Sequence, residues 1–177
     1  VIGANDTIRV GVCGINGRGQ SHMVGFMGQK NVEVSYLIDP DSRLFAPRAK
    51  RIEEMTGKSP QCVQDVRQAL DNGNLDAVSI ATCNHWHSLI GIWACQAGVD
   101  VYVEKPLSHN VFEGRQLAKA AKRHDCVVQH GTQQRSDQGR ANESAAVHSE
   151  QYGKLVVSKG YCCKPRWSIG YKKPTAP

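Results

Sequence analysis

The chain has 177 residues, of which 40% are hydrophobic and 21% are charged, and its formal net charge is +6. These values are typical of a globular protein, and no apolar run approaches the roughly 20 residues of a membrane-spanning helix, so we expect no membrane partner. The basic residues are scattered except near the C-terminus and match no nucleic-acid-binding module. We therefore expect no nucleic-acid partner, whereas a mild positive charge suits an anionic nucleotide.

Strand-like and helix-like stretches alternate from Ile8 onward. The expected strands are Ile8 to Cys13, Val32 to Ile38, a short piece near Cys62, Ala77 to Ala81, Val101 to Val103 and Val127 to Gln129. The expected helices are Gly19 to Gln29, Ser42 to Met55, Asp65 to Asp71, His85 to Ala97 and Val111 to Arg123. This alternation predicts an α/β fold with a parallel sheet covered by helices on both faces.

Short polar residues precede several of these helices. Ser42, Asp65 and Asn110 are candidate N-caps, because their side-chain oxygens can accept from the free N–H groups of a first turn. Asn84 is a further candidate cap, and Gly98 is the expected left-handed residue at the end of the fourth helix.

The sequence becomes polar and rich in Gln and Arg after Gly131. A helix from about Gly139 to Glu150 and a single strand from Lys154 to Cys163 are expected there. One helix and one strand cannot bury a core by themselves. We therefore predict a complete domain over residues 1–132 and the truncated start of a second domain over residues 133–177.

Seven cysteines are spread along the chain without a CxxC spacing. Their odd number, and the apolar patterns around several of them, predict that most are reduced and buried as small hydrophobic residues. A disulfide framework is therefore not expected.

A glycine-rich turn, GINGRG, links the first expected strand to the first helix. Set against the dinucleotide fingerprint G-x-G-x-x-G, Gly14 and Gly19 match the first and third glycines, and Asn16 replaces the second. Asn tolerates left-handed backbone and Gly17 adjoins it, so we expect the loop to cradle a pyrophosphate at the helix N-terminus, with Arg18 adding positive charge. The alternative is an ordinary glycine-rich turn.

The second expected strand is followed by Asp39, 20 residues after Gly19. A carboxylate at this place accepts hydrogen bonds from the ribose hydroxyls of NAD and repels the 2′-phosphate of NADP. Asp39 therefore favours NAD as the cofactor, while Arg43 nearby leaves NADP open. Alternatively, Asp39 only starts the turn Asp39-Pro40-Asp41.

Polar residues also follow the fourth expected strand, at Thr82, Asn84, His85 and His87. Ligands of open α/β sheets bind at the carboxyl ends of the strands, so these residues are candidates to meet one. The spacing of His85 and His87 suggests a metal, but no carboxylate or cysteine completes a zinc pattern with them. We therefore expect no metal.

The next strand runs into Glu104, Lys105 and Pro106, within VYVEKP. A lysine beside a nicotinamide ring can hydrogen-bond a substrate hydroxyl or carbonyl and assist proton transfer. Glu104 would orient the lysine or the cofactor, and a cis Lys105–Pro106 bond would fix the backbone. The alternative is a solvated lysine at a strand end.

These segments together resemble the Gfo/Idh/MocA family, which includes glucose–fructose oxidoreductase and inositol dehydrogenase. The resemblance covers Ile8 to about Arg135 and rests above all on GVDVYVEKPLSHN, supported by GINGRG, Asp39 and TCNHWH. It implies an N-terminal Rossmann domain with a doubly wound parallel sheet that binds NAD or NADP. It further implies a C-terminal α+β domain that covers the nicotinamide and forms homo-oligomers, and a sugar, polyol or related compound as substrate.

By matching position, the resemblance implies that Lys105 is the catalytic lysine. It implies a set of cofactor-side residues comprising Asn84, His87, Glu104 and Gln133. Cys83 stands where the family often has proline. The family's catalytic Asp and His come from its second domain and match no residue here, so we expect this chain to bind cofactor without turning over substrate alone.

We therefore expect an NAD(P)-dependent oxidoreductase that transfers a hydride to or from a sugar, polyol or related carbinol or carbonyl compound. A non-catalytic nucleotide-binding sensor or interaction protein is the main alternative. A methyltransferase is a more distant one, because its cofactor also presents an adenosine. A cytoplasmic location is expected by default, and export is the alternative because the chain begins with Val1 and not with Met.

Overall fold

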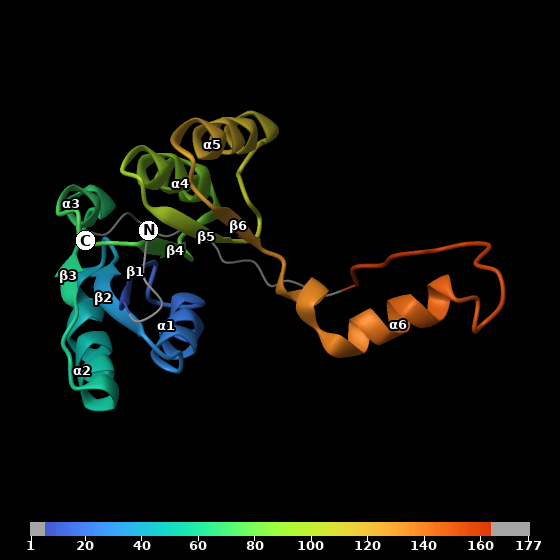
Figure 1. Ribbon diagram of the computed structural model, residues 1–177, viewed down its shortest axis with the longest axis horizontal. Helices are drawn as coiled ribbons and strands as arrows, with labels where there is room; N and C mark the ends of the chain where they lie inside the picture. The colour runs from blue at the N-terminus through green and yellow to red at the C-terminus, as the bar shows by residue number, and fades with distance from the viewer. Residues whose placement is uncertain (1–5, 164–177) are drawn as a thin grey trace. The chain divides into compact units, whose positions relative to one another are not determined.

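The structure of the chain is a computed structural model that describes residues 6–163 (Figure 1). The chain divides into two units between Gly131 and Thr132. The strands of the first unit are β1 (Ile8–Cys13), β2 (Val32–Ile38), β3 (Gln61–Val63), β4 (Ala77–Ile80), β5 (Asp100–Glu104) and β6 (Val128–Gly131). Its α-helices are α1 (Gly19–Met27), α2 (Phe45–Thr56), α3 (Val66–Asp71), α4 (His87–Gln96) and α5 (Val111–His124). No helix within residues 6–163 is both long enough and apolar enough to cross a bilayer.

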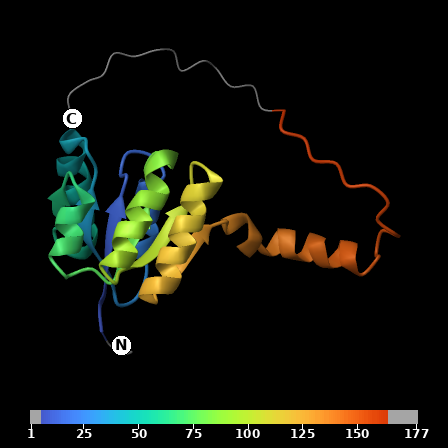
Figure 2. The same cartoon turned by 90° about the horizontal axis from the view of Figure 1, so that it is seen from above.

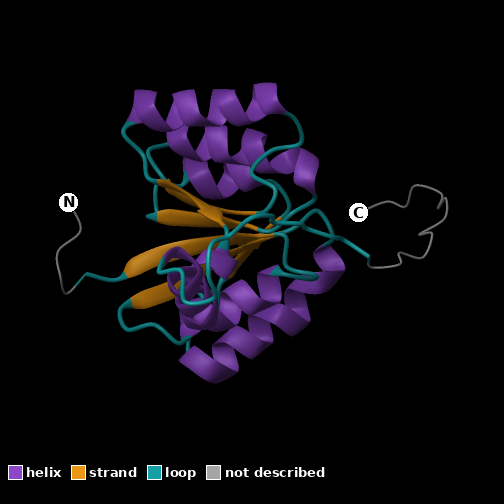
Figure 3. Cartoon of the chain, turned by 90° about the vertical axis from the view of Figure 1, so that its right-hand side faces the viewer, coloured by secondary structure: helices purple, strands orange, loops and turns teal. Residues whose placement is uncertain are grey.

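The six strands form one parallel sheet in the order β3-β2-β1-β4-β5-β6. Helices α1 and α2 cover one face, and α3, α4 and α5 cover the other (Figures 1 and 3). Because β1 pairs with both β2 and β4, the direction of winding reverses between β1 and β4. This is the doubly wound Rossmann arrangement, as predicted.

Buried apolar side chains form one cluster on each face of the sheet. The cluster between the sheet and α3, α4 and α5 includes Val78, Ile80, Val101 and Val103 of the strands and Leu117 of α5. The cluster between the sheet and α1 and α2 includes Val12, Ile15 and Leu37 together with Met23 of α1 and Ile52 of α2. The central strands are covered on both sides, which explains why most of their residues are apolar.

Two of the predicted N-caps are confirmed. The side chain of Asp65 accepts a hydrogen bond from the backbone N–H of Arg67, and that of Asn110 accepts from the N–H of Glu113. Gly98, with φ of +73°, is left-handed as expected.

The other two predicted caps are wrong. A 3₁₀ turn, Ser42–Leu44, precedes α2, and the carboxylate of Asp41 caps it one residue before Ser42 by accepting from the N–H of Arg43. Asn84 lies inside the 3₁₀ turn Asn84–Trp86, so its own backbone is already helical and it cannot act as the cap.

The second unit, as far as residue 163, contains a 3₁₀ turn, Gln133–Ser136, and one α-helix, α6 (Gln138–His148). The strand expected from Lys154 to Cys163 is wrong, because this segment has no regular structure and all of its residues are exposed (Figure 2). Its β-branched residues favour a strand locally. A strand also needs a partner for its backbone groups, and the described part of this unit offers none.

All seven thiols are free, but the expectation that most are buried is wrong. Cys13 and Cys95 are buried and Cys126 is half-buried, whereas the exposed cysteines are Cys62, Cys83, Cys162 and Cys163. Cys62 lies in the edge strand β3, Cys83 in the loop after β4, and Cys162 and Cys163 in the irregular segment after α6.

Candidate functional site

The turn between β1 and α1 brings the backbone close to neighbouring chain segments. Gly14 has φ of +82°, and a Cβ added there would lie 2.6 Å from the carbonyl oxygen of Ala81. A Cβ added at Gly19 would lie 1.9 Å from the carbonyl oxygen of Gly14. Both positions therefore require glycine, in agreement with the fingerprint.

The tip of this turn is open. Asn16 is exposed and its φ is not positive, so the turn does not use the tolerance of Asn for left-handed backbone. An added Cβ at Gly17 would meet nothing within 4 Å. No side chain caps the start of α1, and the N–H groups of Gln20 and Ser21 donate to the carbonyl oxygens of Gly17 and Arg18, so an anion placed there would meet mainly the positive end of the helix dipole. The loop fits a phosphate.

Asp39 lies buried at the C-terminal end of β2, with 7% of its surface exposed. Its Oδ2 accepts a hydrogen bond from the backbone N–H of Ile15 at 2.9 Å, and its Oδ1 accepts from that of Asp41 at 3.0 Å. Both interpretations of Asp39 therefore have support, because it starts the turn and also lies beside the glycine-rich loop. A carboxylate oxygen can accept a second hydrogen bond, so these contacts leave room for a ribose hydroxyl.

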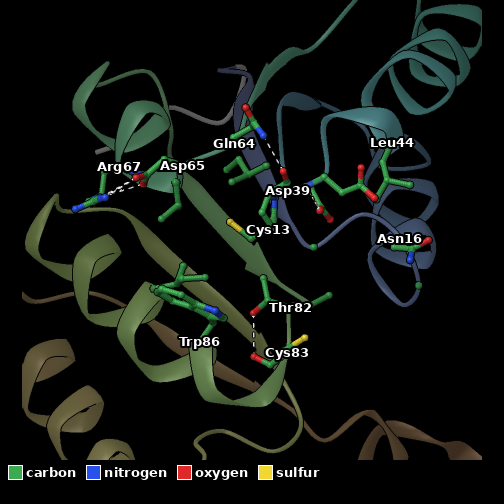
Figure 4. A pocket seen from close by; sticks show the side chains of 18 of the residues that line it. Cys13, Asn16, Asp39, Leu44, Gln64, Asp65, Arg67, Thr82, Cys83 and Trp86 are labelled. Carbon is green, nitrogen blue, oxygen red and sulfur yellow. Dashed lines mark hydrogen bonds and ion pairs between the residues drawn. The ribbon is translucent and has the colours of Figure 1, made fainter. Parts of the chain in front are cut away.

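A pocket of about 600 Å³ opens beside the glycine-rich loop, the end of β2 and the loop after β4 (Figure 4). The predicted site residues that line it are Gly14, Asn16, Gly17, Asp39 and Thr82. It lies where the winding of the sheet reverses, between β1 and β4. Open α/β sheets bind nucleotides at this switch point.

The pocket also has an aromatic wall that the motif analysis missed. Trp86 and Trp93 both line it, with ring centroids 6.3 Å apart. The guanidinium of Arg67 lies 5.2 Å from the centroid of the Trp93 ring, and Asp65 holds it by an ion pair. Flat aromatic and guanidinium surfaces stack well on a planar base. The only signal in the sequence was Trp86, inside TCNHWH.

Arg43, whose positive charge kept NADP possible as a cofactor, already pairs with a carboxylate. Asp41 accepts its Nε–H at 2.7 Å and a second guanidinium N–H at 2.8 Å. This forked pairing lowers the pKa of Asp41 and raises that of Arg43, chiefly through the hydrogen bonds. A 2′-phosphate would have to compete with Asp41 for the guanidinium.

The end of β5 carries the lysine, and the Lys105–Pro106 bond is cis, as predicted. Lys105 is exposed and lies outside the residues that line the pocket. Glu104 is only 5% exposed, and its Oε2 accepts from the backbone N–H of Lys105 at 3.1 Å. Its Oε1 accepts from Nε of Arg18 at 2.8 Å. Arg18 thus connects the glycine-rich loop to the end of β5.

Two buried polar residues beside Glu104 were missed, His22 of α1 and Ser79 of β4. The His22 ring has Nδ1 2.7 Å from the Ser79 hydroxyl and Nε2 3.1 Å from Oε1 of Glu104. Burial lowers the pKa of His22, against the opposite effect of the Glu104 carboxylate. The available signal was RGQSH, which puts His22 one helical turn after Arg18.

The remaining predicted residues lie elsewhere. His87 is buried, with Nδ1 2.6 Å from the carbonyl oxygen of Pro106 and Nε2 3.1 Å from that of Thr82, so it braces the loop after β4 against the turn after Lys105. Asn84 is exposed, and Gln133 belongs to the second unit. Within residues 6–163, no three His, Cys, Asp or Glu side chains gather around a place for a metal.

Comparison with known proteins shows partial matches to longer chains. A glycosyl hydrolase family 109 protein of Shewanella pealeana is 28% identical over 127 residues, which are 70% of this chain and 28% of that protein. The crystal structure of myo-inositol 2-dehydrogenase from Lactobacillus plantarum superposes with a TM-score of 0.74 at 23% identity, over 85% of this chain and 44% of that one. GenD2 from gentamicin A biosynthesis, solved in complex with NAD, superposes with a TM-score of 0.73 at 26% identity, over 84% and 42%.

The family match covers the site itself. The sequence profile of an oxidoreductase family with an NAD-binding Rossmann fold matches residues 8–132, which are most of the chain. That range includes the glycine-rich loop, Asp39, the pocket walls and Lys105, and the cofactor of this type of domain is NAD. The resemblance inferred from the motifs is thus confirmed: the chain belongs to the Gfo/Idh/MocA oxidoreductase family and contains its NAD-binding Rossmann domain.

Proposed function

We propose that the first unit binds NAD across the carboxyl edge of its sheet and that the intact protein is an NAD-dependent dehydrogenase. The bound nicotinamide would supply the hydride chemistry. The substrate would be a sugar, a polyol or a related carbinol or carbonyl compound, the class that the family resemblance implies. The observation that carries the proposal is the pocket at the switch point of the sheet, which is lined by both Gly14 and Asp39.

The parts of NAD would be divided among the elements around the pocket. The pyrophosphate would lie on the glycine-rich loop, which comprises Gly14, Asn16, Gly17, Arg18 and Gly19. Asp39 would accept from the adenosine ribose, with the adenine against the aromatic wall of Trp86 and Trp93. Residues on the nicotinamide side would be Thr82, Asn84, His87 and Glu104.

Lys105 would act on the substrate oxygen. In the oxidation direction, the O–H proton would pass to the amine of Lys105 while the C–H hydride leaves for the nicotinamide, so that the carbinol becomes a carbonyl. Residues from 133 onward would belong to a domain that binds substrate and forms homo-oligomers.

The charges at the end of β2 favour NAD over NADP. Asp39 presents a buried carboxylate at the place where the 2′-hydroxyl would bind. Arg43 would have to share its guanidinium between a 2′-phosphate and Asp41, which already accepts two of its N–H groups.

Calorimetric titration of NAD and NADP into this chain tests the cofactor, and a sugar and polyol screen on the intact protein, followed by NADH absorbance, tests the reaction. We expect NAD to bind more than about 10-fold tighter than NADP. Lys105→Ala should leave the Kd for NAD within about twofold and lower turnover by about 10²–10⁴-fold. A chain that does not bind NAD, or a Lys105→Ala protein that turns over normally, contradicts the proposal.

A second candidate is glycoside hydrolysis, because relatives named glycosyl hydrolase family 109 proteins are 28% identical to this chain over its NAD-binding part. Hydrolysis of a glycosidic bond adds water and leaves the amount of NADH unchanged, whereas a dehydrogenase accumulates NADH. A panel of nitrophenyl glycosides, assayed for both nitrophenol and NADH, therefore separates the two reactions.

A further inference from the structure

The buried polar group formed by Ser79, His22 and Glu104 joins three elements that are distant in sequence. Ser79 lies in β4, His22 in α1 and Glu104 at the end of β5, and all three are buried. His22 and Glu104 are separated by 82 residues along the chain, yet His22 Nε2 and Glu104 Oε1 lie 3.1 Å apart. Buried polar groups are costly unless they are paired, so this arrangement constrains all three side chains.

The partners of His22 determine which ring nitrogen carries its proton. A carboxylate can only accept, so the nitrogen facing Glu104, Nε2, must donate. Nδ1 then accepts from the hydroxyl of Ser79, 2.7 Å away. The charged and titratable groups that face the ring are Glu104 and Tyr102 from β5 and Arg18 from the start of α1. Burial lowers the pKa of His22, which favours this neutral form.

Glu104 connects the His22 ring to the backbone of Lys105. Its Oε1 receives His22 and Arg18, and its Oε2 receives the backbone N–H of Lys105. A carboxylate held on one side by His22 therefore presents its other oxygen in a fixed place. Loss of the His22 hydrogen bond would leave Oε1 to the half-exposed guanidinium of Arg18, so the carboxylate would hold the backbone at Lys105 less firmly.

We infer that His22, oriented by Ser79, is a positioning residue that fixes Glu104 and through it the backbone of Lys105. The catalytic use of Lys105 rests on the proposed function, but the positioning itself does not. The alternative is a histidine that merely fills the core. If His22 only filled the core, its loss would weaken the whole sheet evenly and would not act on one strand end.

Amide hydrogen exchange on this chain, read by NMR without any ligand, separates these roles. His22→Leu removes the donor, and His22→Gln keeps an N–H near the position of Nε2. Ile52→Ala, on α2 and without a hydrogen bond to this group, is the matched control for general destabilisation. We expect His22→Leu to lower the protection of the Lys105 amide by more than about 10-fold beyond the change in β1 and β4, and His22→Gln to restore most of it.

Two results would overturn the inference. One is an unchanged Lys105 amide in His22→Leu, or a loss spread over the sheet as in Ile52→Ala. The other is a ¹⁵N spectrum at pH 7.5 in which His22 is charged or carries its proton on Nδ1. In the intact protein, kcat should fall in His22→Leu with the Kd for NAD unchanged and recover in His22→Gln. Absence of NAD binding by the wild type would contradict the proposed function and leave the exchange result to decide the positioning role.

Discussion

At the scale of single residues, the alkylation rate of Cys83 should show whether the pocket is occupied. Cys83 is exposed and lines the pocket, whereas Cys62 is exposed and does not line it. NAD at 100 times its Kd should therefore slow alkylation of Cys83 by more than about 10-fold and leave Cys62 unchanged. Peptide mass spectrometry after timed iodoacetamide treatment measures both rates. Cys95 serves as an unreactive reference, since burial raises its pKa to about 11.

A second residue-scale prediction concerns the choice between NAD and NADP. Asp41→Asn removes the charge that engages Arg43 but keeps a side-chain oxygen to cap the turn Ser42–Leu44. Arg43 then becomes available to a 2′-phosphate, and we expect the ratio of the NADP and NAD dissociation constants to fall by about 10-fold. Calorimetry measures both constants. The gain in NADP affinity relative to NAD should vanish in the double variant Asp41→Asn/Arg43→Ala. A gain that persists there contradicts this explanation.

At the scale of elements, the turn from β1 to α1 depends on one close approach. An added methyl group at Gly19 would overlap the backbone of Gly14, whereas the same group at Gly17 would lie in open space. We expect Gly19→Ala to lower the free energy of unfolding by at least about 2 kcal/mol and Gly17→Ala to change it by less than about 0.5 kcal/mol. Urea denaturation followed by circular dichroism measures the difference. Equal losses of unfolding free energy in the two variants would show that the close contact between Gly19 and the backbone of Gly14 is not rigid.

At the scale of the whole molecule, the two units should differ in resistance to protease. Lys154 and Lys159 lie in an exposed segment without helix or strand, whereas Lys122 and Arg123 are exposed but lie within α5. A protease needs an extended substrate, so trypsin should cut at Lys154 and Lys159 before it cuts at Lys122 and Arg123. Mass spectrometry of a short digestion identifies the order of cleavage. Early cuts in α5 would contradict the described structure of the first unit.

The local parts of the site were predictable from the sequence because they depend on short-range constraints. Gly14 and Gly19 are required by the turn that contains them, and Asp39 follows its strand at the spacing of the fingerprint. The prediction of a strand from Lys154 to Cys163 was wrong because local β-propensity does not supply a pairing partner.

The sequence by itself determined the parallel sheet, the family and the positions of the glycine-rich loop and Asp39 at strand ends, because apolar periodicity and motif spacing are properties of neighbouring residues. Only the tertiary structure decided that Trp86 and Trp93 line one pocket with Asp39 and that His22 contacts Glu104. The His22–Glu104 contact and the pocket both join residues far apart along the chain. Such contacts form only when the strands have assembled in the order of the folded sheet, and no local sequence pattern encodes them.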